Sequence, residues 1–297
     1  MADLLGRRLD GPARLRALLD DGETIVAPGA YDALSARLVE DAGFPAIYMT
    51  GFGVTASLLG RPDFGLLTMT EMVQTAHRIV STVDVPVVAD ADTGYGNALN
   101  VIRTAQEYEA AGVAAIHLED QVTPKKCGHM DDKQVIAAGA AADKIQAAAA
   151  ARQNPDFVLI ARTDANAVEG LDAAIERGKQ YRDAGADVLF IEALRDEREM
   201  ERVADVFSGV PLLFNWAEGG KTPPISLDRI RELGFRIVIY PISALLAATA
   251  GVREVMKTIR RDGSPINAVR DLPGFAEFTG LVGVDEVLEI ARRFGNG

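Results

Sequence analysis

VPVVADADTGYGNALNVIRTAQEYEAAGVAAIHLE, residues 85–119, is the stretch of sequence that decides the fold. A short apolar run at 85–90 is followed by a polar loop and by a segment of helical period at 99–111. Gly112 is placed to end that helix and leads into a second apolar run at 114–119. A strand, a helix and a second strand in this order predict one βαβ unit of a parallel sheet.

The same order of strand, loop and helix repeats from about residue 24 to about residue 262. Eight short apolar runs are the predicted strands, at 24–28, 46–50, 85–90, 114–119, 157–162, 188–192, 211–215 and 235–240. Helical segments follow them, for example at 33–42, 171–184 and 227–233. Eight such units without a Pro-rich linker or a break in composition favour a closed (β/α)8 TIM barrel of the α/β class over an open, doubly wound sheet.

Both ends of the chain extend beyond the predicted barrel. Residues 15–20 have the pattern of a helix before the first strand, and residues 272–294 form a helical pattern within a C-terminal segment of about 263–297. The barrel itself does not need this segment, and such an extension often packs on a neighbouring subunit. We interpret residues 1–297 as a single barrel domain with an N-terminal helix and a C-terminal helical extension.

Composition excludes several classes of protein. The 297 residues include 31 Lys and Arg against 43 Asp and Glu, a net charge of −12, whereas a nucleic-acid binder needs a basic face. No apolar run approaches the roughly 18 residues of a membrane-spanning helix, and residues 1–20 carry charges where a signal peptide would be apolar. The single cysteine, Cys127, fits a reducing compartment. We expect a cytoplasmic protein that binds neither nucleic acid nor membrane.

Carboxylates gather at the predicted mouth of the barrel, where the carboxyl ends of the strands meet. Asp90 and Asp92 follow the third strand, Glu119 ends the fourth, and Asp63 lies in the long loop after the second. An all-oxygen set of this kind suits Mg²⁺, with Mn²⁺ as a possible substitute. The alternative is that the aspartates cap helices and turns, as an isolated Asp-x-Asp usually does. Glu119 on the neighbouring strand favours the metal.

The loop after the fourth strand, TPKKCGHMDDK at 123–133, contains Cys127 beside Lys126, with His129 two residues further on. Adjacent cations favour the thiolate, so Cys127 is a candidate acid–base or nucleophilic group. A small buried apolar cysteine is the alternative, but a loop this polar is a poor core segment. His77 and His117 are weaker candidates for catalysis.

Further polar residues follow the other strands. Arg162 ends the fifth strand and could grip a substrate carboxylate through two hydrogen bonds, or pair with the acidic cluster, or do both. Glu192 and Asn215 end the sixth and seventh strands and can hydrogen-bond polar substrate atoms, and Glu218 follows in FNWAEGGKTP. Candidate backbone donors to an anion after the second strand are Thr50, Gly51 and Phe52.

With these residues assembled, the chain resembles the isocitrate lyase and phosphoenolpyruvate mutase superfamily over about residues 27–244. The matching strings are PGAYDALSA, MTGFGVTAS, LGRPDFGLLT, DADTGYGNALNV, HLEDQVTPKKCGH, ARTDA and NWAEGGKTP. The resemblance implies Mg²⁺ beside Asp90, with other carboxylates holding its waters at Asp63, Asp92 and Glu119. It implies that Cys127 is the acid–base cysteine of the lyase branch. It also implies that the 2-oxo acid part is bound by Thr50, Gly51, Arg162 and Asn215.

Three features favour the lyase branch over the phosphonate-forming mutases: Cys127, Glu192 where those mutases usually have His, and Tyr48 where they commonly have Trp. The string AEGGK is closer to the 2-alkylmalate and dimethylmalate lyases and the oxaloacetate-cleaving petal death proteins than to 2-methylisocitrate lyase. A carboxyphosphonoenolpyruvate mutase and an oxaloacetate decarboxylase remain alternatives, and a barrel that binds metabolites without turnover is a remote one. Trp216, next to Asn215, stands where these lyases have a small or aliphatic residue. The sequence therefore does not determine the size of the pocket or its substrate.

The expected reaction is cleavage of a 2-hydroxy or 2-oxo di- or tricarboxylate into a 2-oxo acid and a second carboxylate. Cys127 would protonate the enolate-like fragment, with Glu192 and Tyr31 as further catalytic candidates, and either Tyr31 or a metal-bound water would remove the hydroxyl proton. His129 and Glu218 are expected to contact the substrate. The loop at 125–132 would close over the site. The resemblance also implies a homotetramer with an exchanged C-terminal helix.

Overall fold

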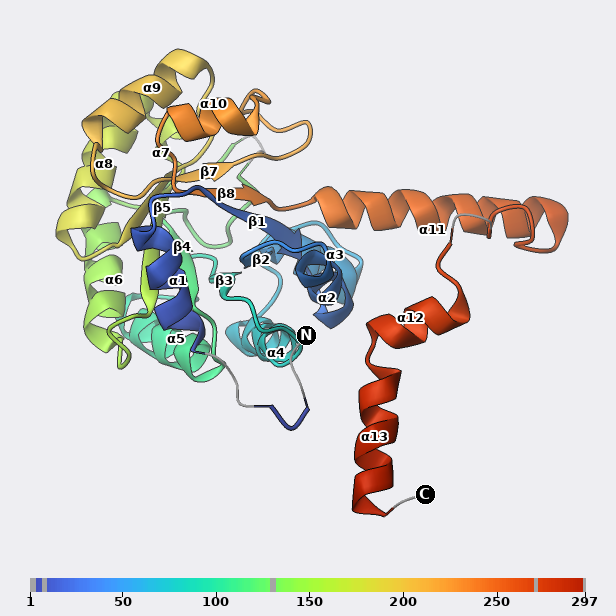
Figure 1. The fold of residues 1–297 in the computed structure, drawn as a ribbon. Helices are drawn as coiled ribbons and strands as arrows, with labels where there is room; N and C mark the ends of the chain where they lie inside the picture. The colour runs from blue at the N-terminus through green and yellow to red at the C-terminus, as the bar shows by residue number, and fades with distance from the viewer. Residues whose placement is uncertain (1–3, 7–9, 129–131, 270–271, 296–297) are drawn as a thin grey trace.

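The computed structural model describes residues 4–6, 10–128, 132–269 and 272–295, and within them eight parallel strands form a barrel with helices around it (Figure 1). The strands are β1 (Ile25–Ala30), β2 (Ile47–Met49), β3 (Val87–Asp90), β4 (Ala115–Glu119), β5 (Val158–Thr163), β6 (Val188–Ile191), β7 (Leu213–Asn215) and β8 (Ile237–Tyr240). Their order is β6-β5-β4-β3-β2-β1-β8-β7, and a parallel bridge between Leu189 and Leu212 links β6 to the chain entering β7. The predicted fold class and all eight predicted strands are confirmed.

The helices begin at the caps that the sequence supplies. Asn97 accepts hydrogen bonds from the N–H groups of Leu99 and Asn100, and Thr68 accepts one from Glu71 N–H, so each satisfies backbone donors at a helix start. The helices are α1 (Gly11–Asp20), α2 (Ala33–Asp41), α3 (Gly51–Leu59), α4 (Met69–Val80), α5 (Ala98–Ala110), α6 (Ala138–Ala151), α7 (Ala165–Val168), α8 (Leu171–Asp183), α9 (Glu197–Val206), α10 (Leu227–Glu232), α11 (Ser243–Asp262), α12 (Phe275–Leu281) and α13 (Val284–Phe294).

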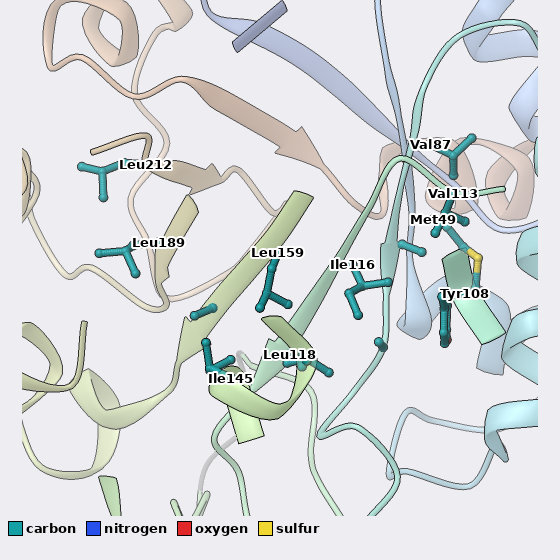
Figure 2. Close-up of a cluster of buried hydrophobic side chains, with 14 of the residues drawn as sticks. Met49, Val87, Tyr108, Val113, Ile116, Leu118, Ile145, Leu159, Leu189 and Leu212 are labelled. Atoms are coloured by element: carbon teal, nitrogen blue, oxygen red, sulfur yellow. The ribbon is translucent and has the colours of Figure 1, made fainter. Parts of the chain in front are cut away.

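Alternate residues of each strand pack into two different cores, as the period of a β-strand requires. Met49, Leu159 and Leu189 belong to the cluster between the strands and the surrounding helices, part of which Figure 2 shows. Their neighbours point into the barrel, where Tyr48 and Ile160 join a second cluster. The side chains of α1, Leu15 and Leu19, also belong to this inner cluster, so α1 closes the amino-terminal end of the barrel.

The C-terminal segment leaves the barrel. In Figure 1, α11 points away from the strands, and α12 and α13 turn back without covering them. The predicted helical extension is confirmed, but it consists of two helices, because Gly283 adopts a φ of +83° between α12 and α13. Large apolar side chains are exposed along this arm, including Val252, Phe275 and Leu288. Within the described residues, none of the helices has both the length and the apolar character needed to span a membrane.

Candidate active site

A cavity of about 230 Å³ lies at the carboxyl ends of the strands, where the sequence places the site. It brings together residues from six strands, β2 to β5, β7 and β8, and from the loops that follow the strands. Nine of the predicted site residues line it: Thr50, Phe52, Asp63, Asp90, Glu119, Cys127, Arg162, Glu192 and Asn215. Residues that the sequence analysis did not assign to the site also line it, chiefly Tyr48, Lys125, Gly128, Ile239, Pro241 and Ile242.

Two backbone N–H groups hold the Asp90 carboxylate. Its Oδ2 accepts a hydrogen bond from Gly51 N–H at 3.1 Å, and its Oδ1 accepts one from Asp92 N–H at 2.9 Å. The close approach requires glycine at 51, since a Cβ there would lie 2.4 Å from Asp90 Oδ2. Burial alone would raise the pKa of Asp90, but His117 and Lys125 hold it far below its ordinary value. Asp90 is therefore an anion in the folded protein.

His117 and Tyr48 complete the surroundings of Asp90. The Nε2 atom of His117 lies 3.1 Å from Asp90 Oδ1 and 2.7 Å from the Tyr48 hydroxyl, and the imidazole is fully buried. From the sequence alone, His117 is a weak candidate for catalysis. Because Glu119 faces the barrel interior at its mouth, the residue two positions earlier on β4 faces it too, and that alternation was the available signal.

Lys125 binds two more of the carboxylates. Its Nζ lies 2.7 Å from Asp63 Oδ2 and 2.7 Å from Asp92 Oδ1, and all three side chains are buried. In the sequence, Lys125 stands out only as one of the cations near Cys127. Burial and the nearby Asp90 and Asp63 charges outweigh Lys125 and raise the pKa of Asp92 to about 6. Asp92 is linked to Asp63 through Lys125, but Asp92 does not itself line the cavity.

The carboxylates at the mouth outnumber the cations beside them, Lys125 and Arg162. Room for a further positive charge there would mean that a metal ion fits the site. Burial raises the pKa of Glu119 well above its ordinary value despite Arg162, and Glu119 Oε1 is buried without a hydrogen-bond partner among the described residues. Among the described residues, no group of three or more His, Cys, Asp or Glu side chains is arranged to bind a metal ion by itself. Mg²⁺ keeps several waters and takes one or two carboxylates directly, so the residues fit a hydrated divalent cation.

Arg162 pairs with the acidic cluster, one of the two roles that the sequence allowed for it. It donates to Asp164 from Nε at 2.9 Å and from Nη2 at 3.1 Å, and its other contacts are Glu119 Oε2 and Glu192 Oε2, both at 3.4 Å. The guanidinium also stacks over Phe190, 5.0 Å from the ring centroid. Asp164 was missed, although it lies two residues beyond Arg162 in ARTDA. Since Arg162 also lines the cavity, it remains placed to meet a substrate carboxylate.

Glu192 and Asn215 form a buried pair. Asn215 Nδ2 donates to Glu192 Oε2 at 3.0 Å, and Glu192 Oε1 accepts a bond from Ala193 N–H at 2.8 Å. Ala193 adopts a φ of +61°, which is strained for a residue with a Cβ. The strained backbone thus turns its own N–H onto the Glu192 carboxylate.

Cys127 is partly exposed and lines the cavity, and its N–H donates to the backbone carbonyl of Asp63 at 3.3 Å. The loop therefore reaches across to the segment after β2. His129, predicted to bind substrate, lies outside the described residues.

Three other residues singled out from the sequence do not line the cavity. Tyr31 is half-buried, and burial raises the pKa of its hydroxyl. Glu218 accepts a hydrogen bond from the Ser243 hydroxyl. Trp216 donates from Nε1 to the Ile225 carbonyl at 3.1 Å and packs on Tyr240, so it holds the loop after β7 and leaves the cavity's size to other residues.

The chain is similar to known proteins over most of its length. The family model described as phosphoenolpyruvate phosphomutase matches residues 15–260. The chain is 46% identical over 285 residues to 2,3-dimethylmalate lyase of Eubacterium barkeri, covering 96% of this chain and 98% of that one. It is 44% identical over 287 residues to the chloroplastic carboxyvinyl-carboxyphosphonate phosphorylmutase of Arabidopsis thaliana, covering 95% and 84%.

Two solved structures extend the comparison. Oxaloacetate acetylhydrolase in complex with the inhibitor 3,3-difluorooxalacetate superposes with a TM-score of 0.92 at 36% identity, covering 98% of this chain and 99% of that one. Phosphonopyruvate hydrolase in complex with oxalate and Mg²⁺ superposes with a TM-score of 0.86 at 36% identity, covering 96% and 99%. Similarity on this scale extends well beyond the site to the whole fold.

Proposed function

This chain belongs to the PEP mutase/isocitrate lyase superfamily, and from that premise we propose that it is a metal-dependent carbon–carbon lyase. Its substrate would be a 2-hydroxy dicarboxylate of the alkylmalate type, cleaved into a 2-oxo acid and a second carboxylate. A 2-oxo dicarboxylate of the oxaloacetate type would react as its hydrate, which carries a C2 hydroxyl, and would give oxalate in place of the 2-oxo acid. The observation that carries the proposal is one cavity that joins Cys127, Arg162 and the Asp90 carboxylate.

A divalent cation, Mg²⁺ or Mn²⁺, would be held by Asp90, with Asp63, Asp92 and Glu119 close by. When bound, it would supply Lewis-acid stabilisation of negative charge on the C2 oxygen of the substrate. The relative with phosphonopyruvate hydrolase activity, whose structure contains oxalate and Mg²⁺, supports a divalent metal in this fold.

The chain's own residues would bind the substrate and move the protons. Arg162 orients the carboxylate next to C2, and Asn215, which Glu192 holds through one amide hydrogen, donates its other amide hydrogen to a substrate oxygen. Loss of the C2 hydroxyl proton, to Tyr31 or to water, lets the C2–C3 bond break, and its electron pair passes to C3 as an enediolate. The Cys127 thiol delivers its proton to C3.

The lining of the cavity supports a dicarboxylate with an apolar substituent. The apolar residues of the lining include Phe52, Ala217, Ile239, Pro241 and Ile242. Among the described lining residues the cations are Lys125 and Arg162, and both already pair with carboxylates. A third substrate carboxylate would lack a free cation to pair with and would lie among apolar side chains, which is costly. We therefore favour malate-type substrates over methylisocitrate.

The decisive experiment identifies the products formed, with Mg²⁺ present, from 2,3-dimethylmalate, other 2-alkylmalates, oxaloacetate, 2-methylisocitrate and phosphonopyruvate. Carbon–carbon cleavage releases a 2-oxo acid from the 2-hydroxy acids and oxalate from oxaloacetate, whereas decarboxylation of oxaloacetate releases pyruvate. We expect turnover of 2,3-dimethylmalate, of another 2-alkylmalate or of oxaloacetate. In D2O, the product that contains C3 should carry one deuterium on that carbon. Rearrangement of a phosphonate substrate without C–C cleavage would contradict the lyase assignment. That second candidate, a phosphonomutase, is supported by the family-model match and the Arabidopsis relative.

We also propose a cytoplasmic homotetramer in which the C-terminal segment is exchanged between subunits. The cytoplasmic location is supported by the single cysteine of the chain. The exchange is supported by the exposed large apolar side chains of α11–α13, helices that extend away from the barrel (Figure 1). Light scattering of the full chain should give four times the 31.7 kDa mass, and a monomer at micromolar concentration would contradict it.

A further inference from the structure

A buried lysine outside the cavity lining holds the loop that carries Cys127. The Lys133 side chain is 1% exposed, and its Nζ donates to the backbone carbonyl of Gly128 and, at 2.6 Å, to Asp164 Oδ1. Asp164 in turn accepts both hydrogen bonds from Arg162. A carbonyl one residue from Cys127 is therefore connected through Lys133 and Asp164 to the guanidinium that would bind the substrate.

The peptide beside Cys127 packs directly on that guanidinium. A Cβ built on Gly128 would lie 2.2 Å from Arg162 Nη2 and 3.0 Å from Glu192 Oε2, so glycine alone allows the contact. Lys133 approaches the same peptide through the Gly128 carbonyl. The backbone next to Cys127 is thus fixed by Lys133 and pressed against Arg162.

Charge neutralisation alone does not explain Lys133. Burial would raise the pKa of Asp164, but Arg162 and Lys133 together lower it to about 2. Arg162 already gives Asp164 two hydrogen bonds, so the carboxylate would stay paired without the lysine. What Lys133 adds is the bond to the Gly128 carbonyl, and burying an ammonium for that bond is costly unless the geometry it enforces is needed.

We propose that Lys133 is a positioning residue that sets the place of Cys127 relative to Arg162. The inference rests on the proposed function, in which Cys127 protonates a fragment of the substrate bound by Arg162. Because proton transfer needs hydrogen-bond reach, a shift of about 1 Å in the loop can cost roughly 100-fold in rate.

The test uses Cys127 as a probe, since it is the only thiol in the chain. Lys133→Met removes both hydrogen bonds and keeps an unbranched side chain. Without substrate, we expect iodoacetamide to alkylate Cys127 several-fold faster in this variant, because the loop is released. With substrate, kcat should fall by roughly 10- to 100-fold while KM changes much less.

The matched control is Lys144→Met. Lys144 is also partly buried, and its Nζ donates to a backbone carbonyl, that of Thr93 at 2.9 Å, but it contacts neither the Cys127 loop nor Arg162 in the described hydrogen bonds. Its alkylation rate and kcat should equal those of the wild type. Equal changes in both lysine variants would show a general loss of stability and overturn the proposal.

Gly128→Ala gives an independent test, and carries it alone if Lys133→Met does not fold. The added methyl group displaces the same peptide from Arg162 without touching the charge on Asp164, so we expect faster alkylation and lower kcat here too. Wild-type alkylation and kcat in either folded variant would overturn the proposal. The alkylation rate needs no substrate, so it can succeed or fail independently of the lyase assignment.

Discussion

The two ends of the barrel are built from the same eight strands and differ in almost every other respect. At the amino-terminal end, Leu15 and Leu19 of α1 pack with apolar strand residues. At the carboxyl end, Asp90, Lys125 and Arg162 are buried among other charges. Apolar packing at the first end contributes stability, whereas the charges at the second are costly to bury and are retained for chemistry. Variants at the two ends should therefore affect different measurements.

The largest effect on turnover should come from the carboxylate centre. Removing divalent metal with a chelator should abolish activity, and Asp90→Ala should do the same, because the proposed cation would lose its main ligand. The free energy of unfolding of Asp90→Ala should also fall, because the buried N–H groups of Gly51 and Asp92 lose their acceptor, so activity must be assayed where the variant is folded. Steady-state kinetics and thermal unfolding check both statements. Full turnover after exhaustive chelation would remove the metal from the mechanism.

Cys127→Ala should have the next largest effect. Positioned acid catalysis contributes about 10² to 10⁴ in rate, so kcat should fall by that factor while substrate still binds through Arg162. Cys127→Ser should be little better, because a hydroxyl is a much weaker acid near neutral pH. Single-turnover kinetics measures the loss. If the wild type cleaves no malate and both proteins decarboxylate oxaloacetate equally fast, the decarboxylase alternative is correct. Malate cleavage by the variant at the wild-type rate would exclude Cys127 as the acid.

Arg162→Lys should have a smaller effect, chiefly on substrate binding. Lysine keeps the charge but cannot make a planar two-bond contact with a carboxylate, and the loss should be about 1.5 to 3 kcal/mol in kcat/KM. The kinetic constants for the best substrate give this value. If kcat/KM is unchanged, the role of Arg162 is confined to its ion pairs with Asp164, Glu119 and Glu192.

Leu15→Ala at the opposite end should leave kcat almost unchanged while it destabilises the fold. Leu15 is fully buried, and truncating such a residue costs about 2 to 5 kcal/mol of unfolding free energy through lost apolar contact and the cavity left behind. Denaturant unfolding measures the loss, with activity assayed well below the midpoint. A large fall in kcat with native stability would mean that the two ends are not separable.

The sequence predicted the strands and much of the mouth because both depend on short-range patterns. Strand register then explains why predicted residues meet: Glu119 pairs with Arg162 across β4 and β5, and Asp90 pairs with His117 across β3 and β4. Alternation along a strand could also have placed His117 beside Glu119, and Asp164 beside Arg162.

Lys125 and Lys133 could not be assigned in this way. Both lie in a loop, where no periodicity says which way a side chain points, and their partners are far away in the sequence, at Asp63 and Asp164. Trp216 is the opposite case, a loop residue that the sequence suggests for the pocket and that does not line it. It adjoins Asn215 in sequence, yet it packs against Tyr240, away from the cavity.

The packed interior of the barrel leaves the cavity open to solvent on one side. Apolar side chains fill the space between the cavity and α1, so among the described residues the mouth is the route by which substrate would enter and both products would depart. In the proposed lyase reaction, the fragment protonated by Cys127 would lie nearer the loop and would leave first, while Arg162 would hold the 2-oxo acid longer. We expect the 2-oxo acid to inhibit competitively and the other product noncompetitively, and product-inhibition kinetics measures this order of release.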